Sequence, residues 1–135
     1  MRQHAVFLGA CGLLPFLLLP LATETKFIAL FEGVSYFLQY AAVILSFLGG
    51  VLWYTALTNH NPVYQIYIAM LPSILAWLSL MFLPYDMVLL TLSAGFVVLL
   101  VYEQRIINAP EWYQRLRLVL TSVVVGCHLM MNWQL

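Results

Sequence analysis

Five apolar stretches, each long enough to cross a lipid bilayer, dominate the sequence. A helix rises about 1.5 Å per residue, so about 20 residues cross a hydrocarbon core about 30 Å thick. The stretches run over residues 4–22, 33–57, 63–83, 84–102 and 112–133. The only acidic or basic side chains inside them are Asp86, Arg115 and Arg117, all near an end. Because backbone groups in lipid must be hydrogen-bonded within their segment, the pattern predicts an all-α, polytopic integral membrane protein, a bundle of five transmembrane helices.

Composition excludes several other classes of protein. Of the 135 residues, 64% are hydrophobic and 7% are charged, which is too few charges to cover a water-soluble fold. The formal net charge is zero, so the chain has no basic surface of the kind that attracts nucleic acid. We expect one transmembrane domain, residues 1–135, surrounded by the lipid bilayer and without nucleic-acid partners.

The basic residues predict the orientation of the chain. With five spans, Arg2, Arg105, Arg115 and Arg117 fall on one side and Lys26 falls on the other. Because basic residues favour the cytoplasmic side, we expect the N-terminus inside and the C-terminus outside. Aromatic residues gather near the same inner surface, as in an interfacial belt: Tyr54, Tyr64, Tyr102, Trp112 and Tyr113.

The first apolar stretch has two other interpretations. Residues 2–22 have the basic start and apolar centre of a signal peptide, and Leu8 to Cys11 resemble a lipoprotein cleavage box. We favour a membrane span because the basic residues balance best with five spans, and because the apolar run before Cys11 is short for a lipoprotein signal.

The links between spans carry helix-start signals. Asn61 before Pro62 predicts an N-cap for the third span, and the run from Asn108 to Glu111 predicts one for the fifth. The tight link at Leu83–Pro84 predicts an antiparallel hairpin of the third and fourth spans. In the link 23–32, apolar residues at helical spacing suggest a short interfacial helix: Phe27, Leu30, Phe31 and Val34.

Small residues mark one face of the second span. Ala42, Ser46 and Gly50 recur every four residues, Gly49 adds a second bare position, and Trp53 extends the same helix-packing or partner face. In lipid, small residues let helix backbones approach closely. Two interpretations remain open, namely packing inside the bundle and docking of another membrane protein. Weaker versions of this spacing occur at Thr91 and Gly95, and at Ser122 and Gly126.

Two prolines, Pro15 and Pro72, lie inside spans and each removes a backbone donor. Such kinks either line a cavity or are bends that a neighbouring helix satisfies. If they line a cavity, we expect Gln39, Ser46 and Ser73 to line it too.

Ionisable residues gather at the two predicted surfaces. The outer group consists of Glu24, Lys26, Glu32, Asp86 and His128. It is either a small acidic site that binds a cation or takes up protons, or a solvated rim in which His128 is hydrogen-bonded to a neighbour, and we favour the solvated rim. On the inner side, Glu111 and Arg115 are spaced to form an ion pair along the helix. Arg105, Arg115 and Arg117 are the candidate contacts for lipid headgroups, with Arg105 and Arg117 left free by that pair.

We expect no enzymatic activity, cofactor or metal. His4 and His60 lie near the inner surface and His128 near the outer one, so no two histidines can ligate one haem or metal. Cys11 and Cys127 have no zinc-site spacing. No Ser-His-Asp set, glycine-rich phosphate loop or paired carboxylates occur at suitable spacing.

Four stretches in order and spacing carry a family resemblance: residues 12–16, 46–53, 71–77 and 110–121. The chain resembles the uncharacterised family of small bacterial membrane proteins known as domain of unknown function 3429, which includes the mitochondrial transmembrane protein 69. This family usually shows a His-Trp-Gly run where this chain has Leu52-Trp53-Tyr54. The resemblance implies the transmembrane topology described above and a location in an energy-transducing membrane. We expect a bacterial cytoplasmic (inner) membrane, because an Arg-rich and Ser-rich mitochondrial presequence is missing.

Two functions fit the sequence. The first is a small non-catalytic accessory or assembly subunit of a larger membrane complex, bound through its small-residue face to a transmembrane partner or to a second copy. The alternative is a small homo-oligomeric transporter or channel for an apolar or weakly polar solute.

The five-span topology makes a direct prediction. Accessibility labelling at Arg117 and at the final residue, Leu135, should reach opposite sides of the membrane, because one span separates them. Labelling of both positions from the same compartment would contradict an odd number of spans.

Overall fold

A computed structural model describes all residues, from Met1 to Leu135, and contains only helices. The helices are α1 (Arg2–Gly12), α2 (Leu14–Glu24), α3 (Leu30–Thr58), α4 (Tyr64–Phe82), α5 (Tyr85–Ile106) and α6 (Glu111–Gln134). Helices α1 and α2 follow one another as one span, so five spans are long and apolar enough to cross a membrane. The all-α, five-span prediction is confirmed. The largest error in a boundary is at the end of α5, predicted at residue 102 and observed at Ile106.

The first span is interrupted at Leu13, two residues before Pro15. Proline has no backbone N–H, so the helical hydrogen bonds cannot run unbroken through this point. The Tyr40 hydroxyl of α3 donates a hydrogen bond of 2.8 Å to the Gly12 carbonyl at the break. The neighbouring helix thus satisfies a backbone group that the interruption would leave unpaired in lipid.

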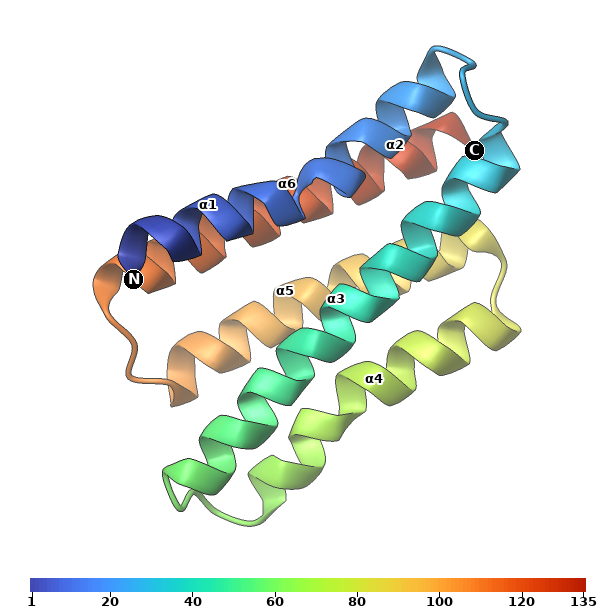
Figure 1. Cartoon of the computed structure of the whole chain (residues 1–135). Coiled ribbons are helices and arrows are strands. Elements are labelled where there is room, and N and C mark those ends of the chain that lie inside the picture. The colour runs from blue at the N-terminus through green and yellow to red at the C-terminus, as the bar shows by residue number, and fades with distance from the viewer.

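Helix α3 is the centre of the bundle. Figure 1 shows α1, α2 and α6 along one edge, α4 along the other, and α3 crossing diagonally in front of α5. Helix α3 contacts α2, α4 and α5. Its 29 residues extend about 43 Å, which exceeds a hydrocarbon core of about 30 Å and is accommodated by tilting.

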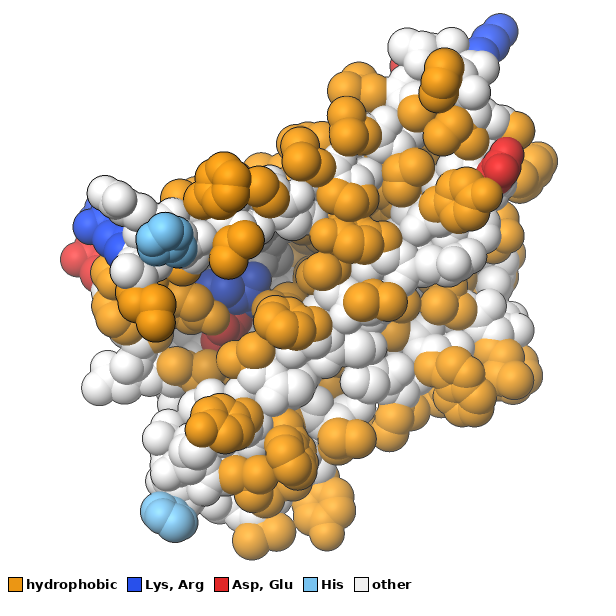
Figure 2. All heavy atoms as spheres, viewed as in Figure 1, with side chains coloured by type: hydrophobic (Ala, Val, Ile, Leu, Met, Phe, Trp, Pro, Cys, Tyr) orange, Lys and Arg blue, Asp and Glu red, His pale blue; other side chains and the backbone are white.

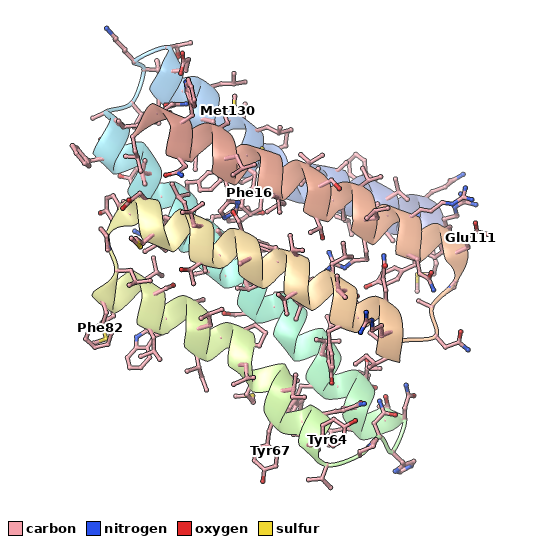
Figure 3. The ribbon with its side chains drawn as sticks, turned by 180° about the vertical axis from the view of Figure 1, so that it is seen from behind. Phe16, Tyr64, Tyr67, Phe82, Glu111 and Met130 are labelled. Carbon is pink, nitrogen blue, oxygen red and sulfur yellow. The ribbon has the colours of Figure 1, made fainter.

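The two ends of the bundle differ in charge. We call the end that holds the N-terminus and the α3–α4 and α5–α6 loops the basic end, because Arg2, Arg105 and Arg115 lie there. The opposite end holds the C-terminus and the α2–α3 and α4–α5 loops. Figure 3 shows Glu111 and Tyr64 at the basic end, and Phe82 and Met130 at the opposite end.

Aromatic rings and close backbone contact form the core. Phe16 meets Phe37 edge to face, with ring centroids 5.4 Å apart, and Phe96 at 6.3 Å. Between α3 and α4, Gly49 lies so close to the Ala69 carbonyl that a Cβ added to Gly49 would be 2.8 Å from its oxygen. The outer surface is covered largely by hydrophobic side chains, as a lipid-facing surface requires (Figure 2).

Two predicted helix caps are wrong. The amide of Asn61 bonds the Ala56 carbonyl and so closes the end of α3, and α4 begins after Val63 with no side-chain cap. The cap of α6 is Pro110, not Asn108, and it also makes no side-chain hydrogen bond, although Glu111 does occupy the first turn.

The α2–α3 link contains no interfacial helix. The amides of Phe27 and Ile28 both bond the Ala22 carbonyl, so this link is a tight turn, and Leu30 already belongs to α3. The predicted hairpin at Leu83–Pro84 is confirmed, since α4 and α5 are joined there and run antiparallel.

The two adjacent glycines of α3 predict different responses to the same change. Gly49→Ala places a methyl group against the Ala69 carbonyl and should lower the free energy of unfolding by about 1–3 kcal/mol. Gly50→Ala meets no atom within 4 Å and should not lower it. Unfolding in detergent by titration with sodium dodecyl sulfate, followed by circular dichroism, measures both. Equal effects at the two positions would contradict the α3–α4 contact.

Candidate functional site

A buried ion pair joins α5 to α6 near the basic end. The Arg117 Nε donates to Glu103 Oε2 at 2.8 Å, and the two side chains are 8% and 7% exposed. The Tyr113 hydroxyl donates to Glu103 Oε1 at 3.3 Å, and Arg117 Nη1 donates to the Thr121 hydroxyl at 3.4 Å. The Arg117 Nη2 is buried without a hydrogen-bond partner. This cluster satisfies most of the polar atoms that two charges bring into the bundle.

The structure corrects the prediction that Arg117 is free for lipid headgroups. Glu103 and Arg117 lie on opposite sides of the short α5–α6 loop, so an antiparallel hairpin brings them to the same level. The Glu103 carboxylate accepts a hydrogen bond from Arg117 and neutralises its charge, so Arg117 does not need a lipid phosphate as its partner. The predicted Glu111–Arg115 pair is confirmed on the exposed surface, and Arg105 is also exposed. The pairing of two opposite charges across a short loop is the signal that sequence reasoning missed.

His128 occupies an aromatic cage rather than a solvated rim. It is 1% exposed, and its ring centroid lies 4.8 Å from that of Phe37, 5.6 Å from that of Phe96 and 5.8 Å from that of Phe16. The Nδ1 lies 2.8 Å from the Val124 carbonyl, whereas the Nε2 has no partner. The predicted hydrogen bond is present, but the predicted solvation is wrong because α2, α3 and α5 enclose the ring.

The outer ionisable group does not form one site. Glu24, Glu32 and Asp86 are exposed, and His128 is sealed away from them in the core. The carboxylate of Glu32 accepts a hydrogen bond of 2.9 Å from the Tyr36 hydroxyl on the same helix.

The small-residue face of α3 divides into two sides. Ala42 and Gly49 are buried inside the bundle, and the Ser46 hydroxyl donates to the Ala42 carbonyl of its own helix at 2.8 Å. Gly50 faces outward with open space around its Cα, and Trp53 is 41% exposed. The first side packs the bundle, and the second is available to something outside the chain.

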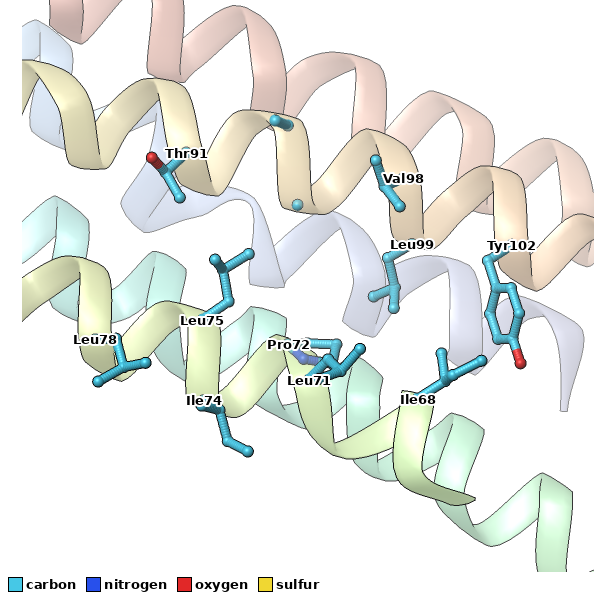
Figure 4. A pocket seen from close by; sticks show the side chains of 12 residues that line it. Ile68, Leu71, Pro72, Ile74, Leu75, Leu78, Thr91, Val98, Leu99 and Tyr102 are labelled. Carbon is cyan, nitrogen blue, oxygen red and sulfur yellow. The ribbon is translucent and has the colours of Figure 1, made fainter. Parts of the chain in front are cut away.

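A groove of about 720 Å³ lies between α4 and α5. Its wall is almost entirely apolar, and its only hydroxyl groups belong to Thr91 at one end and Tyr102 at the other (Figure 4). The Tyr102 hydroxyl is buried and has no hydrogen-bond partner in the protein. The lining residues are Ile68, Leu71, Pro72, Ile74, Leu75, Leu78, Thr91, Ala94, Gly95, Val98, Leu99 and Tyr102.

The kinks and polar residues predicted to share a cavity are not brought together. Pro72 lines the α4–α5 groove, but Gln39, Ser46 and Ser73 are not among its lining residues, and neither is Pro15. The Gln39 amide is exposed and donates to the Ser35 hydroxyl at 3.1 Å.

The five long apolar helices define a multi-pass membrane protein with five helical spans. The family model for "Protein of unknown function (DUF3429)" matches residues 1–132, so the chain belongs to this family. It is similar to "Transmembrane protein 69" of Xenopus tropicalis, with 33% identity over 131 residues, covering 91% of this chain and 51% of the relative. The chain therefore spans about half the length of that relative. No solved structure matches it.

Removal of one partner from the buried ion pair should be more harmful than removal of both. Glu103→Leu leaves a buried guanidinium without its partner and should lower the free energy of unfolding by about 3–5 kcal/mol. The double variant Glu103→Leu with Arg117→Met should recover most of that loss. Glu111→Gln, which breaks the exposed pair, is the control and should have little effect. A double variant that is no more stable than the single one would contradict this account.

Proposed function

We propose that this protein is a non-catalytic accessory or assembly subunit of a larger membrane complex, and that the outer face of α3 binds a transmembrane helix of its partner. The observation that carries the proposal is the open position at Gly50. A Cβ added there would meet no atom within 4 Å, although the adjacent Gly49 is packed against α4.

The outer face of α3 has the spacing of a helix-packing surface. Val43, Phe47, Gly50, Tyr54 and Leu57 are all exposed and follow one another at intervals of four and three residues. Residues at this heptad spacing form one stripe along a helix, suited to a second helix at a small crossing angle. The bare position of Gly50 in this stripe gives room for a side chain of that second helix.

Aromatic rings border the bare position. Phe47 lies one turn before Gly50, and Trp53 and Tyr54 lie one turn after it; all three are exposed. In lipid, helices associate through close dispersion contacts rather than through a hydrophobic driving force. A glycine between large rings supports such contact because it lets a partner approach the α3 backbone while the rings enclose it.

The stripe is long enough for a transmembrane partner. The 14 residue steps from Val43 to Leu57 extend about 21 Å along the helix, which is most of a hydrocarbon core of about 30 Å. We place the complex in a bacterial cytoplasmic membrane with the basic end inside. The bias of arginine residues to this end supports that orientation.

Cross-linking in intact membranes tests the proposal. A photoreactive residue in place of Phe47 should cross-link to a different polypeptide, and Gly50→Leu should reduce this product at least about tenfold, because the bulky side chain fills the space at Gly50. Gly126→Leu is the matched control, because Gly126 on α6 also has no atom near an added Cβ. It should leave the product unchanged.

Two outcomes would overturn the proposal. The first is a cross-link from position 47 only to lipid or to another copy of this chain, which would contradict binding to a separate partner protein. The second is an equal yield with Gly50→Leu and with the unaltered chain, which would contradict binding of the partner at the outer face of α3. Circular dichroism of the purified variants establishes that each one is folded.

A further inference from the structure

The α4–α5 groove has an almost wholly apolar wall and a volume of about 720 Å³. A volume of this size lies in the range of small-molecule sites. An apolar groove that faces hydrocarbon therefore suits a slender apolar occupant.

The length of the groove matches one leaflet of a bilayer. Thr91 and Tyr102 lie at its two ends (Figure 4) and are separated by 11 residues, or about 16 Å of helix. Half of a hydrocarbon core of about 30 Å is about 15 Å. One acyl chain of the leaflet at the basic end would thus extend from Tyr102 to Thr91.

The groove has one polar group at its basic end that lacks a hydrogen-bond partner inside the protein. The Tyr102 hydroxyl is buried at the basic end of the groove and lacks a partner, although a buried hydroxyl normally forms a hydrogen bond. In Figure 4 this hydroxyl points across the groove toward α4. The ester carbonyl at the head of an acyl chain is an acceptor at the required depth.

A basic residue continues the same face of α5 toward the membrane surface. The lining residues Thr91, Ala94, Val98 and Tyr102 recur at intervals of three and four, and Arg105 is the next position at this spacing. Arg105 is exposed in the last turn of α5 and makes no ion pair in the protein. Its guanidinium is therefore available to a phosphate just beyond the ester group.

We propose that the α4–α5 groove binds one phospholipid from the leaflet at the basic end. One acyl chain lies along the groove, the ester carbonyl accepts a hydrogen bond from Tyr102, and the phosphate lies beside Arg105. This lipid site is independent of the proposed partner face, because the groove and the outer face of α3 share no residue.

Native mass spectrometry of the full chain in detergent tests the site, with palmitoyl-oleoyl phosphatidylglycerol as the probe. The unaltered chain should bind one molecule saturably. Ala94→Phe fills the groove and should weaken binding at least about tenfold. Val97→Phe, an exposed position on α5 outside the groove, is the matched control and should change it less than about twofold. Equal binding by Ala94→Phe and by the unaltered chain would overturn the proposal, as would equal loss in both variants.

Two further variants test the polar contacts separately. Tyr102→Phe removes only the hydroxyl and should weaken binding about three- to tenfold, as the loss of one hydrogen bond does. Arg105→Gln should weaken phosphatidylglycerol binding about fivefold but leave diacylglycerol, which has no phosphate, unchanged. Arg115→Gln is the control for charge.

Unchanged binding in Tyr102→Phe and Arg105→Gln would mean that hydrocarbon fills the groove without recognition of a lipid, which contradicts the proposal. Gly50→Leu should bind the lipid normally, so failure of the partner face can be told apart from failure of this site.

Discussion

Close contact between backbones holds this bundle together. Hydrocarbon solvates an apolar side chain about as well as another apolar side chain does, so helices in lipid gain stability mainly from dispersion and from polar groups paired inside the protein. Gly49 of α3 lets the backbone of α4 approach at Ala69, and α3 in turn contacts α2 and α5. Because α3 connects both edges of the bundle, its surface decides which helices are neighbours and which faces remain open.

The polar residues within the spans follow the same requirement. Glu103 and Arg117 neutralise one another with help from Tyr113 and Thr121, so two charges lie almost fully buried inside the bundle. His128 fills a space between phenylalanine rings and bonds its own helix. In each place one polar atom lacks a hydrogen-bond partner, namely Nη2 of Arg117 in the ion pair and Nε2 of His128 between the rings. The Tyr102 hydroxyl differs because it lacks a partner beside an open groove.

The sequence predicted the spans well because the thickness of hydrocarbon fixes the length of a helix and excludes charges from its centre. It also predicted the Glu111–Arg115 pair, whose partners lie four residues apart on one helix. The Glu103–Arg117 pair was missed, because it depends on how α5 and α6 rotate about their axes, and a loop of a few residues does not determine that rotation. The same limit explains why Gly49 and Gly50 could not be separated into inner and outer positions. The groove could not be predicted because it arises from the separation of α4 and α5, which no local pattern records.

The interruption at Leu13 has a consequence for how this bundle opens. Helix α1 contributes no buried residue, and apart from the hydrogen bond of Tyr40 to Gly12 at its end it packs mainly on α2 and α6, so it has the least packing of the six segments. Local opening begins where the fewest interactions must be broken. Reversible detachment of α1 about Leu13 is therefore the easiest large motion available to the fold. The central helices would remain assembled while this N-terminal arm exchanges between protein and lipid.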